Sequence, residues 1–318
     1  MKKLLVLTIV SLFLATSCKK VTDDPISNSS AYKTLTTYMV ANDMDLPDIL
    51  TDWIVPAPAL ADVQTFINTY DIIDIRSAAD YAAGHIEGAV NSTLANVLTT
   101  AAGTTKPILV VCYTGQSAAH AVVALKLSGY TAKVLMWGMS GWTSTLSGSW
   151  EANSGPVNGI TAIGHTNWVT TPTTSLATFG DPDITGTGDA ATMLATRVQT
   201  MLDNGFKGVT NTDVLDAPSN YFINVYWSQA DVDTYGHIAE AYRVNPLTLS
   251  VGEMSNLDPS QKIVTYCWTG QTSSMITAYL NVIGYDAASL KFGANGMIYT
   301  DLQSHKYVTP TVDLPIVQ

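Results

Sequence analysis

The sequence has few charged residues and no cluster of basic residues beyond its first three positions. Only 13% of its 318 residues are charged and 47% are hydrophobic, so the chain can fill real hydrophobic cores. Its length suits two domains of ordinary size. The formal net charge of −11 argues against a nucleic-acid partner, because phosphate binding requires basic patches. No spacing of Cys, His and Asp suggests a metal site, and we expect no cofactor.

Long apolar runs are also missing, apart from one at the N-terminus. Lys2 and Lys3 precede an apolar stretch at residues 4–14, which is too short to span a bilayer comfortably. Small residues then lead into Cys18, and this pattern resembles the lipobox of bacterial lipoproteins, in which the cysteine is lipidated. The resemblance implies a signal peptide at residues 1–18, followed by a polar tether at residues 19–32. A plain secretory signal with an incidental cysteine is the alternative.

A lipid on Cys18 would anchor the protein to a membrane of the bacterial cell envelope. We expect the outer membrane, on its periplasmic or surface face. Removal of the signal peptide takes Lys2 and Lys3 away, so the formal charge of the mature chain would fall from −11 to −13.

Cysteine is scarce too. With Cys18 assigned to the anchor, only Cys112 and Cys267 remain, in a compartment that favours oxidation. A disulfide between them is one interpretation, and a pair of inert buried thiols is another. Neither interpretation accounts for the sequence that follows each cysteine, which is nearly the same in both places.

A six-residue pattern occurs twice, each time starting at a cysteine. The copies are Cys112, Tyr113, Thr114, Gly115, Gln116 and Ser117, and Cys267, Trp268, Thr269, Gly270, Gln271 and Thr272. The match continues without a gap at an offset of 155 residues, through the glycines at 138 and 141 and those at 293 and 296. Such a match predicts a duplicated structural unit.

Each copy of the pattern lies between a predicted strand and a predicted helix. Apolar, β-prone runs at residues 107–111 and 262–266 precede the cysteines, and helical stretches follow them. Strands alternating with helices predict an α/β fold, in which each domain has a parallel sheet with helices on both faces. We expect domain one at residues 33–150, a linker rich in Ser, Thr, Gly and Pro at 151–186, and domain two at 187–318.

A cysteine between a strand and a helix is well placed to act as a thiolate. Free cysteine ionises near pH 8.5, and a thiolate nucleophile must ionise more easily. Neither loop contains a basic residue, so the stabilising charge must come from backbone N–H groups and the positive end of the helix dipole. Gly115 and Gly270 would let the backbone curl around the sulfur.

The whole pattern resembles the rhodanese family of sulfurtransferases. Four pieces in the right order carry the resemblance: Asp74-Ile75-Arg76, the segment from Tyr81 through Gly84-His85-Ile86 to Asn91, the Cys112 loop, and Gly138-x-x-Gly141-Trp142. Domain two keeps Gly236-His237-Ile238, the Cys267 loop and the glycine ending. It departs where Asn224 and Tyr226 are expected to replace the Asp and Arg, and where Glu240 replaces a glycine.

The resemblance implies two rhodanese-like domains and a sulfur transfer in which Cys112 and Cys267 become persulfides. A small sulfur donor loads the cysteine, and a thiol or cyanide accepts the sulfur. The implied substrate-binding residues are the five that follow each cysteine, at 113–117 and 268–272. Asp74, Arg76, His85 and His237 are implied to be structural, since a thiolate already formed needs no general base.

Two other functions compete with this one. Phosphatases on related folds carry an arginine at the sixth position after the cysteine, where it clamps phosphate. Ala118 and Ser273 occupy that position here, which argues against a phosphatase. The second alternative is a non-catalytic rhodanese-like module that binds a partner or carries sulfide, and the uncharged loops keep it open.

Overall fold

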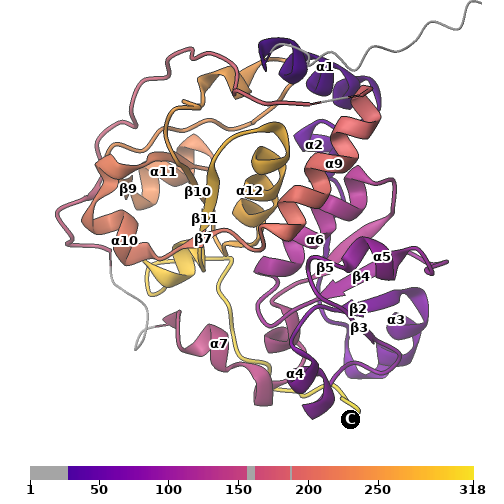
Figure 1. Ribbon diagram of the computed structural model, residues 1–318. Coiled ribbons are helices and arrows are strands. Elements are labelled where there is room, and N and C mark those ends of the chain that lie inside the picture. Colours follow the sequence, from indigo (N-terminus) through magenta and orange to yellow (C-terminus); the bar gives the residue numbers. More distant parts are fainter. Residues whose placement is uncertain (1–27, 156–161, 187) are drawn as a thin grey trace, which may run out of the picture.

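Two parallel sheets form the framework of the protein. The computed structural model describes residues 28–155, 162–186 and 188–318. The strand order is β1-β5-β4-β2-β3 in the first sheet and β7-β11-β10-β8 in the second (Figure 1). All neighbours within these sheets are parallel. The strands are β1 (Ile54–Val55), β2 (Asp71–Asp74), β3 (Val90–Asn91), β4 (Ile108–Val111), β5 (Ala132–Leu135), β7 (Gly208–Val209), β8 (Phe222–Val225), β10 (Ile263–Tyr266) and β11 (Ala287–Leu290).

Helices connect the strands and cover the sheets, which confirms the expected α/β fold with two similar units. They are α1 (Asn28–Ala41), α2 (Leu46–Ile49), α3 (Val63–Thr69), α4 (Ala78–Ala83), α5 (Val97–Ala101), α6 (Gln116–Leu127), α7 (Gly148–Glu151), α9 (Ala190–Asp203), α10 (Asn211–Asp216), α11 (Gln229–Tyr235) and α12 (Gln271–Ile283). Helices α6, α9 and α12 lie side by side in the middle of the molecule (Figure 1). Within the described ranges, no helix is both long enough and apolar enough to cross a membrane.

The hydrophobic core has three layers, separated by the two sheets. Side chains alternate between the faces of a strand, so Ile108 and Val110 of β4 join the central layer while Leu109 and Val111 join the outer layer of the first unit. The central layer contains residues of α1, α6, α9 and α12 and therefore belongs to both units. A core shared in this way holds the two units together by the burial of apolar surface.

Segments outside the two repeats also pack on them. Within the expected linker, Ala162 is buried, and β6 (Trp168–Val169) pairs antiparallel with β9 (His237–Ile238) of the second unit. The expected signal peptide and most of the expected tether lie outside the described residues. The last tether residues differ from the expectation, because Ala31 and Tyr32 are buried in the central core.

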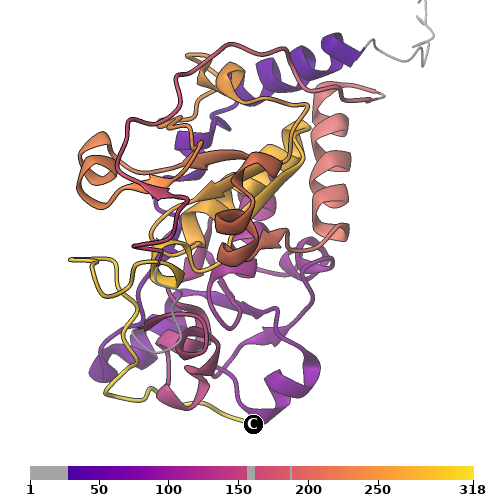
Figure 2. The same ribbon diagram turned by 90° about the vertical axis from the view of Figure 1, so that its left-hand side faces the viewer.

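The C-terminal segment returns from the second unit to the first. Leu314 is buried in the outer core of the first unit, and the indole N–H of Trp142 donates to the carbonyl oxygen of Pro315 over 2.9 Å. His85 and Val317 exchange two backbone hydrogen bonds of 2.9 Å. Figure 2 shows this segment running down the molecule beside the first unit. The end of the chain therefore ties the two units together.

Candidate functional site at two cysteine loops

The first candidate site lies where β4 ends and α6 begins. Cys112 follows the strand directly, and Gly115, at φ +78°, turns the chain into the helix. The Cys112 sulfur accepts hydrogen bonds from the backbone N–H groups of Gly115, at 3.1 Å, and Ala118, at 3.4 Å. The residue is 4% exposed. Two amides and a helix N-terminus therefore direct positive charge at the sulfur, as the sequence predicted.

The second site has the same backbone and a different set of donors. Gly270, at φ +77°, makes the same turn between Cys267 and α12. The Cys267 sulfur accepts from the backbone N–H of Ser273 over 3.3 Å and also lies 3.5 Å from the Ser273 hydroxyl oxygen. Cys267 is 2% exposed, and both cysteines are free thiols, so the alternative interpretation of a disulfide between them is wrong.

A glycine packs against the backbone carbonyl group of each cysteine. A Cβ atom on Gly138 would lie 2.3 Å from the carbonyl oxygen of Cys112, and one on Gly293 would lie 2.2 Å from that of Cys267. These contacts are too close for any side chain. The same carbonyl of Cys112 accepts the N–H of Met139 at 2.8 Å, so the loop is fixed from both ends.

Three positions of each loop are half-buried, and the glutamine is buried. The half-buried residues are Tyr113, Thr114, Ser117, Trp268, Thr269 and Thr272. Gln116 is 3% exposed and Gln271 is 1% exposed. Each glutamine reaches the opposite unit: the Gln116 side-chain oxygen accepts from the N–H of Phe292 over 2.9 Å, and the Gln271 amide donates to the Thr114 carbonyl over 3.2 Å. The substrate-binding role of these residues stays a prediction, and both glutamines lie in the contact between the two units.

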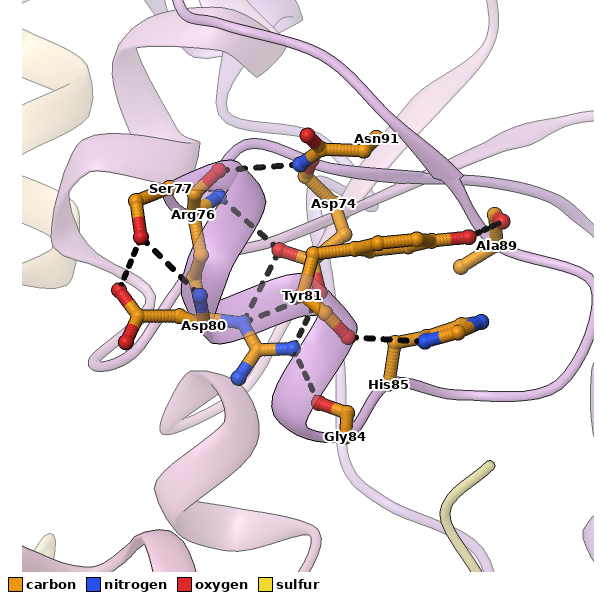
Figure 3. Close-up of polar contacts among 9 residues, drawn as sticks. All are labelled: Asp74, Arg76, Ser77, Asp80, Tyr81, Gly84, His85, Ala89 and Asn91. Carbon is orange, nitrogen blue, oxygen red and sulfur yellow. Dashed lines mark hydrogen bonds and ion pairs between the residues drawn. The ribbon is translucent and has the colours of Figure 1, made fainter. Parts of the chain in front are cut away.

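A buried ion pair supports the first loop. Arg76 donates to the Asp74 carboxylate from Nε and Nη2, with a shortest distance of 2.6 Å, and also donates to the carbonyl oxygen of Gly84 (Figure 3). Asn91 donates to the carbonyl oxygens of both Asp74 and Arg76 at 3.0 Å. The Arg76 guanidinium lies 5.3 Å from the centre of the Tyr113 ring. The pair therefore fixes the turn after β2 and places a cation next to the aromatic ring of Tyr113.

The sequence profile of the rhodanese-like domain matches residues 59–145 and 195–297. The chain belongs to the rhodanese-like family. The two matched stretches coincide with the two units described above, and each contains one of the cysteine loops. A search of curated proteins finds no significant match.

Three of the solved structures that match this chain come from different organisms. A thiosulfate sulfurtransferase from Pseudomonas aeruginosa is 15% identical over 90% of this chain and 49% of its own, with a TM-score of 0.29. The 3-mercaptopyruvate sulfotransferase of Escherichia coli is 16% identical over 76% of this chain and 98% of its own, with a TM-score of 0.28. A rhodanese-related protein from Thermoplasma volcanium is 22% identical over 28% of this chain and 89% of its own, with a TM-score of 0.25.

The second rhodanese-like unit replaces the ion pair differently from the expectation. Asp74 pairs with the residue before Cys112, whereas the residue before Cys267 pairs with Val225. Val225 and Trp227 therefore occupy the places of Asp74 and Arg76, and the expected equivalence of Asn224 and Tyr226 is wrong by one residue. The sequence does not reveal this register, because all four residues of β8 are buried and the strand has no alternation of buried and exposed positions.

Aromatic rings take the place of the cation at the second site. The Trp227 ring stacks on Trp268 with centroids 4.3 Å apart and an interplanar angle of 12°. His305, from the C-terminal segment, stacks on Trp268 at 5.3 Å and 16°. Trp268 is therefore held between two rings, whereas Tyr113 faces an arginine. Sequence reasoning missed Trp227 and His305, because only the strand register and the path of the C-terminal segment reveal them.

Asn224 and Glu240 have other roles. The Asn224 side-chain oxygen accepts from the N–H of Val244 over 2.8 Å and so fixes the loop beside β8. Glu240 lies at φ +65°, close to the +79° of Gly88, so it occupies the predicted glycine position in a left-handed conformation.

The two loop histidines contact backbone carbonyls. His85 Nδ1 lies 2.9 Å from the Tyr81 carbonyl oxygen, and its ring stacks on the Tyr81 ring (Figure 3). His237 lies between the carbonyl oxygens of Ile238, at 2.8 Å, and Thr171, at 2.7 Å. These contacts suit residues that fix loops. Among the described residues, no three His, Cys, Asp or Glu side chains form a group that could hold a metal, and Cys18 lies outside the described ranges.

Proposed function

We propose that the protein is a sulfurtransferase that carries sulfane sulfur as a persulfide on Cys112 and on Cys267. The observation that carries this proposal is the pair of backbone N–H groups, from Gly115 and Ala118, that point at the Cys112 sulfur. This arrangement suits an anionic sulfur, because hydrogen bonds to an ionised group are stronger than those to a neutral one. The membership of both units in the rhodanese-like family supports the same conclusion.

The reaction has two displacement steps. The thiolate attacks the sulfur that is transferred, the bond between that sulfur and the rest of the donor breaks, and the leaving group departs with the electron pair. The bond broken is S–S in thiosulfate, which releases sulfite, and C–S in 3-mercaptopyruvate, which releases the enolate of pyruvate. A cysteine persulfide remains. Cyanide or a thiolate then attacks the terminal sulfur, the persulfide S–S bond breaks, and its electron pair restores the cysteine thiolate. The loop amides stabilise the anionic sulfur before and after each step.

Cys112 is proposed to carry most of the turnover. Its sulfur has two amide donors, and the first unit keeps the Asp74–Arg76 pair beside its loop. Changing Cys112→Ser should remove most thiosulfate-to-cyanide turnover, while Cys267→Ser should leave most of it. The opposite order would overturn the assignment to Cys112, and full activity in the double variant would overturn the sulfurtransferase proposal itself.

A binding or sulfide-carrier module is the second candidate. It is favoured by the burial of Cys112 and Cys267, which are 4% and 2% exposed, and by the lack of basic residues in both loops. A carrier would gain sulfur from a donor protein but would not turn over free thiosulfate. Transfer of sulfur from a donor to both cysteines equally, without turnover of free thiosulfate, would favour this candidate.

We also propose that a lipid on Cys18 anchors the protein in the bacterial cell envelope. The support is the sequence pattern of residues 1–18. Two or more acyl chains give stable membrane binding, because each buried CH₂ group contributes about 0.8 kcal/mol. Wild-type protein should fractionate with membranes, and Cys18→Ala should give unprocessed precursor or soluble protein. Wild-type protein in the soluble fraction would contradict the anchor.

A further inference from the structure

Buried hydroxyl groups lie beside the second cysteine at positions where the first unit has aliphatic residues. At the offset of 155 residues that relates the two units, five aliphatic residues of the first unit become hydroxyl residues in the second. The pairs are Val110 and Thr265, Ala118 and Ser273, Ala119 and Ser274, Val122 and Thr277, and Val134 and Ser289. All five hydroxyl residues are at most 1% exposed. The change in polarity is therefore confined to the core beside one cysteine.

Three of these hydroxyl groups form a chain that starts at the sulfur. The Cys267 sulfur lies 3.5 Å from the Ser273 hydroxyl, which lies 2.8 Å from the Ser289 hydroxyl. Ser289 in turn donates to the carbonyl oxygen of Gly270 over 3.3 Å. That carbonyl also accepts the Ser274 hydroxyl over 2.6 Å and the Ser274 N–H over 3.1 Å.

The remaining hydroxyl groups have no compensating bond. The Thr265 and Thr277 oxygens are buried, with no hydrogen-bond partner among the described residues. Thr265 pairs with Ser289 in the β10–β11 ladder, and Thr277 lies one helical turn after Ser273. Burying an unpaired hydroxyl is unfavourable, and valine stands at both positions in the first unit. Packing alone therefore does not explain why this core is polar.

The chain of hydroxyl groups has two orientations that keep its donors paired. With a neutral thiol, Cys267 donates to Ser273, Ser273 donates to Ser289, and Ser289 donates to Gly270. With a thiolate, the proton leaves to solvent, Ser289 donates to Ser273, and Ser273 donates to the sulfur. The Gly270 carbonyl still has both Ser274 donors in the second orientation. A hydroxyl pair can therefore follow the charge of the sulfur without leaving a buried donor unpaired.

We propose that Ser273 donates a hydrogen bond to the ionised sulfur of Cys267, with Ser289 as the positioning residue that orients Ser273. At the first site the second hydrogen-bond donor to the sulfur is the Gly115 N–H. At the second site that donor is the Ser273 hydroxyl. The inference rests on the proposed sulfur transfer for its purpose, because a persulfide cycle needs Cys267 as a thiolate. Its test does not need a sulfur donor.

The test measures the pH dependence of iodoacetamide alkylation at each cysteine of the full chain, by peptide mass spectrometry. Ser273→Ala, which copies Ala118, should raise the midpoint pH of Cys267 alkylation by about one unit, a tenfold fall in thiolate at a fixed low pH. Ser289→Val should raise it by less. Thr265→Val, which removes a hydroxyl not bonded to the chain, should leave it unchanged. The Cys112 midpoint should stay constant in all three variants.

An unchanged Cys267 midpoint in Ser273→Ala would overturn the proposal, as would an equal shift at Cys112. The reverse exchange gives a second test if the serine variants fold poorly. Ala118→Ser combined with Val134→Ser should lower the midpoint of Cys112, and no change there would count equally against the proposal. If the alkylation midpoints shift as expected but neither cysteine takes up sulfur, the proposed sulfur transfer is contradicted and the role of Ser273 stands.

Discussion

The side-chain amide of Gln271 donates a hydrogen bond of 3.2 Å to the backbone carbonyl of Thr114, 157 residues earlier in the chain. Gln116 makes the reciprocal contact, because its oxygen accepts the N–H of Phe292 in the loop after β11. The partners fix the orientation of both amides, since an N–H can only donate and a carbonyl can only accept. Both hydrogen bonds therefore run from a donor in the second unit to an acceptor in the first, so Gln271 donates and Gln116 accepts.

The opposite roles of the two glutamines give a prediction for one substitution made at two places. Gln116→Glu keeps an acceptor for the Phe292 N–H, whereas Gln271→Glu places a carboxylate against the Thr114 carbonyl. Both changes bury a charge, so the difference between their effects reports which glutamine donates and which accepts. Gln271→Glu should lower the free energy of unfolding by about 1–3 kcal/mol more than Gln116→Glu, measured by urea denaturation at neutral pH. Equal losses, or a larger loss for Gln116→Glu, would show that these bonds do not form.

The Asp74–Arg76 pair should show strong coupling. Each residue is at most 4% exposed, so removing one leaves the other charge buried without its partner. Arg76→Met, or Asp74→Val as in the second unit, should each lower the free energy of unfolding by about 3–5 kcal/mol. The double variant should cost clearly less than the sum, as a double-mutant cycle by chemical denaturation would show. Additive losses would mean that the pair does not act as a unit.

His120 should make the fold sensitive to acid. Burial, with a smaller effect of the Lys207 charge, lowers the pKa of His120 from 6.5 to about 3. The folded chain therefore stays neutral there while the unfolded chain binds a proton, so stability is complete above pH 6.5 and falls as the pH drops toward 3. His120→Met, which copies the buried Met275, should remove this loss. At pH 4.5 the variant should gain up to about 3 kcal/mol relative to wild type, compared with pH 7.5.

The pH series of thermal or urea unfolding for both proteins checks this prediction, since every other titrating group is shared. The Nδ1 atom of His120 has no hydrogen-bond partner in the described part of the chain, and the ring packs edge-on against Phe206, so methionine suits the space by volume. Parallel pH profiles for wild type and variant would contradict it.

Charge at the rim of the first loop should control the use of thiosulfate. The half-buried residues of that loop are neutral, and a chain of formal charge −11 repels a dianion. Ser117→Arg should raise kcat/KM for thiosulfate several-fold at low ionic strength, and salt should reduce the gain. Ser117→Gln is the control of similar polarity without charge. A gain that is equal for glutamine, or independent of salt, would contradict the electrostatic explanation. Gln116 is unsuitable for this test because it is buried between the units.

The local parts of the fold could be predicted from the sequence. An apolar run, a cysteine, a glycine turn and a helix follow one another within some twenty residues, and the repeat shows them twice. The left-handed glycines at 115 and 270 follow from the same pattern. These features depend on neighbours along the chain, which a sequence displays directly.

Features that depend on distant contacts could not be predicted. A strand buried on both faces has no alternation, so the β8 register, and with it Val225 and Trp227, had to come from the structure. The C-terminal segment pairs with His85 through only a few backbone bonds, which carry no side-chain signal. The serines beside Cys267 were visible in the repeat, but only their hydrogen bonds gave them a role.

The central claim is that both cysteines form persulfides, and intact-protein mass spectrometry tests it most directly. The folded protein is incubated with thiosulfate or 3-mercaptopyruvate, desalted and weighed, and peptide mapping locates any added sulfur. The account predicts one added sulfur atom on Cys112 and one on Cys267. Each cysteine-to-serine variant should lose only its own. Folded protein that gains no sulfur from either donor, or gains it only at other residues, would contradict the account.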